Sequence, residues 1–340
     1  GAQFSIDNNR DMMILHLKTL TEKNAKQQAT ELFTRIIKQP DFPEKAYTRE
    51  KNQQRMAIRQ ALESPDTVAN QAFFHALYQT HPYGHPVSGD LKTLDAITLK
   101  NVRDFHHTFF VSQNAVLVLV GALNRAEAEI LAEQMTQYIP QGKPALSIRN
   151  AEPLAEAKEI KLPFQSSQTV LRLGQLGIDH HNPQYFPLLV GNYTLGGGAL
   201  VSRLASELRE KRGLTYGVHS QFIPMPELGP FVIGFSTKNT QAAMAETLTR
   251  DTLSAFVKTG PSEAELKAAK QYLTGSFPLS IANNQNMSRI LLKMAFYNLP
   301  DNYLDTYRDK ISAVKIQDIQ AAFQHNIQPE RLLHVMVGSV

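Results

Sequence analysis

Disulfide bonds and thiolate metal ligands are excluded, because the 340 residues contain no cysteine. That absence fits an oxidising compartment. No apolar stretch approaches the length of a membrane-spanning helix. The net charge of +4 is mild for this length and is not gathered into a run of lysine and arginine, so the sequence indicates neither nucleic-acid binding nor an anionic membrane.

The composition is that of an ordinary globular protein with enough apolar residues for a large core. Hydrophobic residues make up 42% of the chain and charged residues 19%. A length of 340 residues predicts two domains. The first four residues resemble neither a signal peptide nor a natural start, so we expect that upstream sequence has been removed.

The segment 196–216 is the most informative part of the sequence. It begins with a glycine triplet, which can take backbone angles closed to other residues and suits a tight entry into the next element. Leu200, Leu204 and Leu208 then recur at helical spacing and predict one buried helix face. Gly213 is placed to cap the end of that helix.

Two arginines and a tyrosine lie near the end of this predicted helix. Arg209 and Arg212 fall near its end, and Tyr216 begins an apolar segment. The segment therefore brings a guanidinium and a phenol close together where a helix turns into a strand. Both groups are suited to gripping a peptide backbone or a carboxylate. The competing interpretation is structural, with an arginine favoured by the helix dipole and a partly buried tyrosine.

Two parts of the chain repeat each other at a nearly constant offset. The tripeptide A-L-Y at 76–78 matches A-F-Y at 295–297 at an offset of 219, and Lys51 matches Lys270 at the same offset. Beyond the loop at 81–86 the offset becomes 217, and the matching apolar positions are those of 96–102 and 116–121 with 313–319 and 333–338. An ordered series of this kind predicts an internal duplication.

Each copy is predicted to run from a strand through several helices to a second strand. In the first copy we expect strands at residues 12–17 and 115–120 and helices at 24–38, 43–63, 67–80, 98–110 and 125–138. In the second copy we expect strands at 231–236 and 332–337 and helices at 241–258, 262–299 and 316–325. This order predicts an α+β fold of two related α/β sandwich domains, each a sheet with helices packed on one face.

The duplication also sets the expected domain boundaries. The first domain is predicted at residues 1–139 and the second at 154–340, with a linker at 140–153 that contains P-Q-G-K-P. The second copy has residues 154–229 ahead of its strand, whereas the first copy has only residues 1–11. We therefore expect the first domain to lack most of its front portion.

Several short blocks in a fixed order resemble the pitrilysin/insulinase-type zinc metallopeptidases, which include the mitochondrial processing peptidases. The blocks are F-P-E at 42–44 with R-E-K at 49–51, H-P-Y-G-H-P at 81–86 with Gly89, Asn114 leading into V-L-V-G at 118–121, L-G-G-G at 195–198, S-R-L at 202–204, L-R-E at 208–210 and G-L-T-Y at 213–216. The resemblance extends from about residue 10 to the C-terminus. It implies a pair of related α+β domains, in agreement with the duplication.

In that family two histidines of an H-x-x-E-H helix and a more distant glutamate hold zinc, and the motif glutamate acts as general base. No H-x-x-E-H occurs here, and the helix that would carry it falls in the front portion that is expected to be missing. The distant glutamate should lie about eight residues before Pro65, at Ala57. Alanine cannot bind a metal, and Glu63 lies nearly two helical turns farther on. The resemblance therefore implies a zinc-less version of the domain.

The same resemblance assigns a role to Arg209 and Tyr216. Family members carry an arginine and a tyrosine seven residues apart in the second domain, facing the zinc across a cavity, and these two residues have that spacing. The implied roles are to hold the substrate backbone and to stabilise the oxyanion as water attacks. His81 and His85 also have a spacing found in metal sites, but the proline after each of them disfavours a helix there.

Three functions are compatible with these features. The leading hypothesis is a non-catalytic, zinc-less subunit or half of a pitrilysin-type zinc metallopeptidase, which closes a chamber and binds unfolded peptide through Arg209 and Tyr216 while a related partner subunit holds the zinc. The second is a fragment of an active zinc metalloendopeptidase whose zinc helix lies outside this sequence. The third is a non-enzymatic scaffold with the same fold. A zinc-less, cysteine-free member fits a bacterial, periplasmic protein.

Overall fold

The computed structural model describes residues 1–339, which form two compact units. Unit 1 comprises residues 1–60, 87–147 and 281–298, and unit 2 comprises residues 61–86, 148–280 and the chain from 299 onward. The chain therefore passes from one unit to the other five times. Each unit is built from segments that lie far apart in the sequence.

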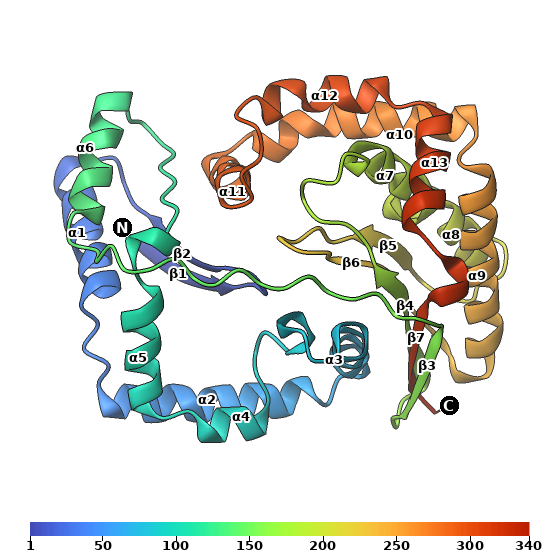
Figure 1. Ribbon diagram of the computed structural model, residues 1–340, viewed down its shortest axis with the longest axis horizontal. Coiled ribbons are helices and arrows are strands. Elements are labelled where there is room, and N and C mark those ends of the chain that lie inside the picture. The colour runs from blue at the N-terminus through green and yellow to red at the C-terminus, as the bar shows by residue number, and fades with distance from the viewer. Residues whose placement is uncertain (340) are drawn as a thin grey trace. The chain divides into compact units, whose positions relative to one another are not determined.

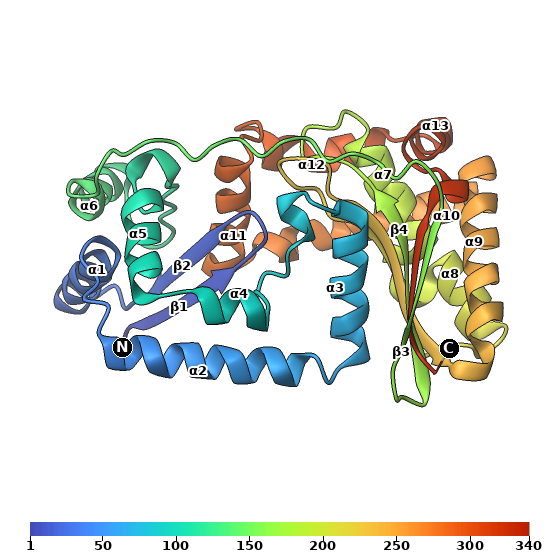
Figure 2. The ribbon, with the colours of Figure 1, turned by 60° about the horizontal axis from the view of Figure 1, so that its bottom comes forward.

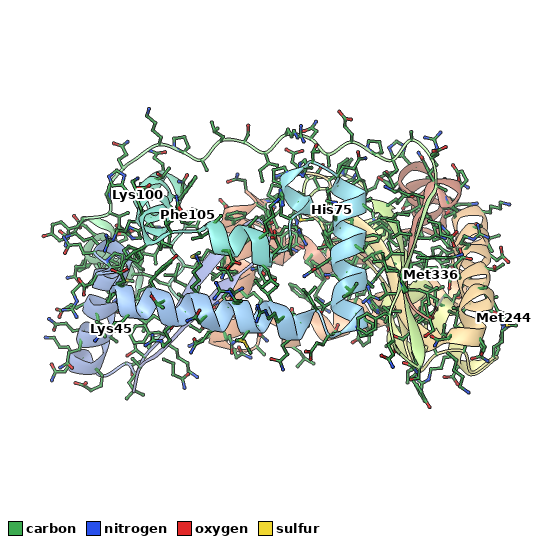
Figure 3. The ribbon with its side chains drawn as sticks, turned by 90° about the horizontal axis from the view of Figure 1, so that it is seen from below. Lys45, His75, Lys100, Phe105, Met244 and Met336 are labelled. Carbon is green, nitrogen blue, oxygen red and sulfur yellow. The ribbon has the colours of Figure 1, made fainter. Side chains whose placement is uncertain are left out.

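Unit 1 combines a β-hairpin with a set of helices (Figure 1). The two strands pair antiparallel, with Phe4 opposite Leu17 and Ile6 opposite Leu15. Several large apolar side chains of this unit, such as Phe105 on a helix surface, are half exposed (Figure 3). The elements of unit 1 are β1 (Gln3–Asn8), β2 (Met13–Lys18), α1 (Lys23–Lys38), α2 (Glu44–Ala61), α4 (Leu91–Ala96), α5 (Leu99–Phe109), α6 (Arg125–Thr136) and α11 (Asn284–Phe296).

Unit 2 is built on a five-stranded sheet with the strand order β3-β7-β4-β6-β5. The strands are β3 (Lys158–Pro163), β4 (Gln168–Leu176), β5 (Val218–Phe222), β6 (Pro230–Lys238) and β7 (Leu333–Gly338). β3 runs parallel to β7, and all other neighbours are antiparallel. β7 and β4 occupy the centre of the sheet, where strands are buried on both faces.

Helices cover both faces of this sheet, as Figure 2 shows. α3 (Pro65–Tyr78) packs on β4 and β7 on one face. The opposite face carries α7 (Tyr185–Asn192), α8 (Arg203–Ala205), α9 (Ala242–Thr259), α10 (Glu263–Ser276), α12 (Tyr303–Ala313) and α13 (Ile316–Asn326). The predicted α+β class is confirmed, and α3 adds a helix on the second face.

The side chains of β7 alternate between two hydrophobic clusters, one on each face of the sheet. Leu333, Val335 and Val337 point into the cluster formed with α3, whereas Met336 belongs to the cluster formed with α9 and its neighbours. Successive side chains of a strand point to opposite faces, so a strand covered on both sides must be apolar at every position or pair its polar groups. The exception on β7 is His334, whose Nδ1 lies 2.6 Å from a carboxylate oxygen of Glu246 on α9.

α3 is fixed on the sheet by apolar packing and by one ion pair. Its buried residues include Phe73 and Leu77. Gly174 on β4 makes room for the first of these, since a Cβ there would lie 2.8 Å from the ring tip of Phe73. At the start of α3, Asp66 pairs with Arg172, a buried cation on β4 that also donates to the carbonyl of Leu171.

The strand predicted at residues 115–120 is wrong. This segment is extended but unpaired, and Val116 and Leu117 are exposed. Its pattern resembles that of β7, yet β7 lies between β3 and β4 and hydrogen-bonds to both. A strand exists only where a neighbour accepts its backbone groups, and among residues 1–339 no strand pairs with this segment.

The single helix predicted at residues 262–299 is also wrong. α10 ends at Ser276, a 3₁₀ turn follows at Phe277–Ile281, and α11 begins at Asn284. Pro278 explains the break, because it lacks the N–H that an α-helix needs and its ring clashes with the preceding turn. Asn283 then caps α11 by accepting a hydrogen bond from the Asn286 backbone N–H.

Arg203 and Glu265 join α8 to α10. Nε and Nη2 of the guanidinium each lie 2.7 Å from a different oxygen of the Glu265 carboxylate. The same carboxylate accepts a hydrogen bond from the Ser262 backbone N–H and so completes the capping box at the start of α10. Burial alone would raise the pKa of Glu265, but the hydrogen bonds from Arg203 and Ser262 outweigh it and lower the pKa to about 2.

Replacing Asp66 with Asn should destabilise unit 2 by about 1 to 2 kcal/mol, because the buried Arg172 cation loses its counter-charge. Urea unfolding followed by circular dichroism measures the change. Asp104→Asn is the matched control, since the Asp104–Lys100 pair lies exposed on α5 and should contribute less than about 0.5 kcal/mol. Equal effects of the two substitutions would contradict the role given to Asp66.

Glu265→Gln should lower the unfolding free energy by about 1 to 3 kcal/mol at pH 7. The pKa of Glu265 is lower in the folded state than in the unfolded state, so its stabilisation is complete above about pH 4.5 and is lost as the pH falls towards 2. The difference between the two proteins should therefore shrink to less than half at pH 3. Urea titrations at both pH values test this, with Glu263→Gln in the same helical turn as the control. A difference that does not depend on pH would rule out the charged pair as its source.

Candidate functional site

The segment that carries the candidate site is a series of short turns in unit 2. A π-helical turn at Tyr193–Gly197 is followed by a 3₁₀ turn at Ala199–Val201, then by α8 and a second π-helical turn at Ser206–Glu210. Ser202 caps the start of α8, and its side chain accepts a hydrogen bond from the Ala205 backbone N–H. The predicted single helix therefore begins later than expected and changes its hydrogen-bonding pattern at its end.

Gly196 lets this segment approach the edge strand β5. A Cβ at Gly196 would lie 2.7 Å from the Ser220 backbone nitrogen, a contact that real side chains do not make. Beside it, Asn192 Nδ2 donates to the Ser220 carbonyl at 2.9 Å, and Ser220 Oγ donates to Asn192 Oδ1 at 2.8 Å. The outer edge of β5 is therefore covered by buried, satisfied polar groups.

The apolar face of the segment is partly as predicted. Leu204 and Leu208 are fully buried in the core beneath β5 and β6. Leu200 is 57% exposed, so its predicted place on the buried face is wrong. The reason is the Ser202 cap, because Leu200 lies in the 3₁₀ turn before the helix and does not share its periodicity.

Most of the cations near Arg209 are already paired. Arg203 is held by Glu265, and Glu207 binds Arg212 at 2.6 Å as well as Lys211. Hydrogen bonds from Lys211 and then from Arg212 lower the pKa of Glu207, so this carboxylate is ionised at neutral pH.

Arg209 differs from these cations. Its Nε lies 3.6 Å from a carboxylate oxygen of the adjacent Glu210, which is longer than a hydrogen bond. Within residues 1–339 its side chain has no other ion pair or hydrogen bond. Its guanidinium donors thus remain available to a ligand.

Tyr216 lies at the tip of a loop whose backbone is held by hydrogen bonds. Gly213 has φ +61° and closes the helix, with its N–H bonded to the Arg209 carbonyl, as predicted for a capping glycine. Thr237 Oγ1 donates to the Leu214 carbonyl, and Thr215 Oγ1 donates to the carbonyl of Gly217. The loop backbone is thereby fixed, while the Tyr216 side chain is 90% exposed.

The structure does not join Arg209 and Tyr216 directly. In the described part of the chain, no hydrogen bond links the guanidinium to the phenol, and the Tyr216 hydroxyl bonds to no protein group. Both side chains leave the same helix-to-strand connection and offer hydrogen-bond donors. Such donors match the carbonyl oxygens of an extended peptide.

The position expected for a zinc ligand is unsuitable for a metal. Ala57 lies exposed on α2, with Met56 exposed on one side of it and Ile58 buried on the other. Glu63 lies beyond the end of α2 and does not continue its face. Within residues 1–339, no three His, Cys, Asp or Glu side chains are grouped so as to hold a metal ion. The residues present do not fit a zinc site.

His81 has a structural role. Its Nε2 lies 2.7 Å from the Arg149 carbonyl, and its Nδ1 accepts from the Tyr83 backbone N–H. These two contacts require the proton on Nε2 and hold together a 3₁₀ turn and the segment that leads into β3. His81 is buried and His85 is exposed, so the two rings do not form a metal site.

Several residues that shape the site were missed by sequence analysis. Glu265 could have been noticed, because S-x-x-E at 262–265 is a capping-box signal, but its partner lies 62 residues away. Asn192 is a polar residue at the end of an otherwise apolar helix, which is a weak signal of a buried hydrogen bond. No local pattern marks Ser220 as the residue that Gly196 approaches.

Comparison with known proteins places the chain in a family. A model described as the peptidase M16 inactive domain matches residues 96–273. The uncharacterized zinc protease YmxG of Bacillus subtilis is 25% identical over 85% of this chain and 69% of its own length. An uncharacterized zinc protease of Mycobacterium tuberculosis is 24% identical over 77% of this chain and 60% of its own. The non-peptidase homolog YmxG of Helicobacter pylori is 23% identical over 100% of this chain and 78% of its own.

Solved structures support the same family assignment. The crystal structure of a peptidase M16 inactive domain from Pseudomonas fluorescens superposes with a TM-score of 0.96 at 35% identity, covering 100% of this chain and 81% of that one. A protease from Helicobacter pylori has the same fold, with a TM-score of 0.91 at 18% identity. None of the helices in residues 1–339 is both long and apolar enough to cross a bilayer. This chain belongs to the peptidase M16 family, the pitrilysin/insulinase-type group that its motifs indicate, and it matches the inactive domain of that family.

Proposed function

We propose that this chain is a non-catalytic, zinc-less subunit or half of a pitrilysin-type zinc metallopeptidase, in which it binds the substrate and closes the chamber. The observation that carries the proposal is that no carboxylate holds Arg209 at hydrogen-bond distance. The neighbouring cations are paired, whereas the nearest carboxylate oxygen to Arg209 lies 3.6 Å from its Nε. Tyr216 supports it, because a nearly fully exposed tyrosine on a fixed loop has an apolar ring and a hydroxyl ready for a ligand.

In this proposal the two side chains act on peptide carbonyl groups. The Arg209 guanidinium donates to substrate backbone oxygens, and the Tyr216 hydroxyl donates to the oxygen on which negative charge develops as water attacks. The zinc would belong to a related partner subunit, since the residues around Ala57 offer no metal ligand. Chamber closure requires that partner as well.

The duplication is part of the same proposal, and the order of elements supports it. The series β1, β2, α1, α2, α3, α4, α5 and residues 115–120 corresponds to β5, β6, α9, α10, α11, α12, α13 and β7. Lys51 Nζ donates to the Asp95 carbonyl, and Lys270 Nζ donates to the Ser312 carbonyl, which are equivalent contacts at the offsets of the repeat. α3 and α11 also stand 219 residues apart.

A second candidate is a fragment of an active zinc metalloendopeptidase. What favours it is that relatives in Bacillus subtilis and Mycobacterium tuberculosis are named zinc proteases and are longer than the matched part of this chain. The family description as an inactive domain and the Helicobacter pylori name as a non-peptidase homolog favour the first proposal.

Arg209→Ala and Tyr216→Phe should each lower kcat/KM for peptide cleavage by about tenfold to a hundredfold in a mixture of this chain with its zinc-bearing relative. Each removes a donor that contacts the substrate, so the fold of the chain should be unchanged. Fluorogenic-peptide hydrolysis by the mixture measures the effect. Arg212→Ala is the matched control, because Arg212 is already bound to Glu207.

Three outcomes separate the candidates. Activity that needs both proteins and falls with either substitution supports the non-catalytic subunit. Zinc-dependent cleavage by this protein in the absence of any relative would favour the active peptidase. Equal activity of Arg209→Ala, Tyr216→Phe and Arg212→Ala would overturn the roles of the first two residues.

A further inference from the structure

Two polar side chains meet on the face of the unit 2 sheet that α3 partly covers. Arg172 on β4 is the cross-strand partner of Gly234 on β6, and Gly234 is in turn the partner of His219 on β5. Cross-strand partners point to the same face of a sheet. A Cβ at Gly234 would lie 3.0 Å from His219 Cε1 and 3.1 Å from Arg172 Nη1. The absent side chain therefore lets the imidazole and the guanidinium approach each other above Gly234.

This face is accessible at β5. α3 packs on β4 and β7 (Figure 2), whereas β5 is contacted mainly by β6, α7, α8 and the turn at Tyr193–Gly197. Val218 points into the core on the opposite face. Along β5, Val218 and Ser220 are buried, while His219 and Gln221 are exposed. A ligand can therefore reach this face at His219.

Both polar groups retain hydrogen-bonding capacity. Arg172 is buried, and its Nη1 donates to the Leu171 carbonyl while its Nη2 pairs with Asp66. A guanidinium carries five N–H donors, so Nη1 keeps a second N–H for another acceptor. Within residues 1–339, the His219 side chain has no hydrogen bond or ion pair. The pair thus combines a buried cation with an accessible, unbonded imidazole.

The imidazole is neutral in the absence of a ligand. Partial burial of the ring and then the charge of Arg172 lower the pKa of His219, and the opposite charge of Asp66 offsets only part of this effect. The other elements that contact β5 bring ionisable residues that do not contribute to the shift: Tyr185, Tyr193, Arg203 and Lys238. An anion placed beside His219 would favour its protonated form.

We infer that the space above Gly234 is a subsite for a carboxylate, which accepts hydrogen bonds from Arg172 Nη1 and from a protonated His219. The ligand is an acidic side chain of the peptide whose backbone Arg209 and Tyr216 bind, so this inference rests on the function proposed above. His219 follows Tyr216 by three residues, which is at most about 11 Å of chain, so one extended peptide can reach both.

The charges of the subsite select a single carboxylate. Asp66 already neutralises Arg172, so the site gains a full positive charge only when His219 takes up a proton. One carboxylate matches that charge. The second negative charge of a phosphate would face Asp66 without compensation, and a neutral amide would not favour the imidazolium. Binding of an acidic side chain therefore takes up one proton.

Nuclear magnetic resonance of the ¹³C-histidine-labelled 340-residue chain tests this inference. The probe is an acetylated and amidated Ala-Glu-Ala tripeptide, with the matching Ala-Gln-Ala tripeptide as control. We expect saturation with the first peptide to raise the pKa of His219 by about one unit. Its affinity should accordingly be about fivefold higher at pH 5.5 than at pH 7.5. The glutamine peptide should change neither quantity.

A third peptide identifies the source of the carboxylate. Acetylated Ala-Ala-Ala carries its only carboxylate at the C-terminus. It should bind more weakly than the glutamate peptide, because the inference assigns the subsite to a side chain. Tighter binding of this peptide would overturn that assignment.

Substitutions locate the subsite. Gly234→Ala should weaken binding of the glutamate peptide at least about tenfold, because the new methyl group occupies the space between the two side chains. Gly234 does not have a positive φ, so alanine is compatible with its backbone. Gly275→Ala on α10 is the control, since no atom lies within 4 Å of the added methyl. His219→Gln identifies the His219 signal and should abolish the pH dependence, whereas His181→Gln, at another exposed histidine, should preserve it.

The inference is overturned if His219 titrates identically with and without the glutamate peptide, if the glutamine peptide binds equally well, or if His219→Gln keeps the pH dependence. None of these readouts uses peptide cleavage. A subsite that binds the carboxylate while Arg209→Ala and Tyr216→Phe leave cleavage unchanged would leave this site standing and refute the roles of those two residues. The two failures are therefore distinguishable.

Discussion

The close approach of residues 192–196 to the edge strand β5 is the constraint on which the candidate site depends. Gly196 lies where a side chain would meet the Ser220 backbone nitrogen, and Asn192 satisfies the carbonyl that β5 leaves unpaired. With the segment held there, Leu204 and Leu208 reach the core. The end of the π-helical turn, and with it Arg209, is thereby fixed relative to the sheet. A substrate-binding side chain has to start from a rigid backbone of this kind.

Ion pairs around residues 203–212 distinguish cations that stabilise the fold from a cation that is available to a ligand. Glu265 and Glu207 hold three cations near Arg209, and in both carboxylates hydrogen bonds from cations contribute to a lowered pKa. Neither carboxylate is therefore protonated near neutral pH, and neither releases its partner. Arg209 lacks such a partner in the described residues. Arg203 and Arg212 are each held by a carboxylate at hydrogen-bond distance, and this difference supports the ligand-binding role proposed for Arg209.

Sequence patterns predicted most of the helices and strands of this fold, because each is defined by local periodicity and capping. They were wrong where the outcome depends on distant residues. Residues 115–120 alternate as a strand should, but pairing needs a neighbour that periodicity cannot supply. The break at Pro278 has a local signal, because proline lacks the backbone N–H that a continuous helix needs. Within the site, the positions of Arg209 and Tyr216 came from family spacing, whereas the Arg203–Glu265 pair links residues too far apart in sequence for any local signal.

The two compact units do not follow the order of the chain. α3 lies between two segments of unit 1 in the sequence but packs in unit 2, where Phe73 and Leu77 complete the core against β4 and β7. α11 lies between two segments of unit 2 in the sequence and belongs to unit 1. The predicted linker at 140–153 includes one passage from unit 1 to unit 2, at residues 147–148, but the chain makes four further passages outside it. Unit 2 therefore depends on a helix from the N-terminal part of the chain, because without α3 one apolar face of its sheet would lose the helix that covers it.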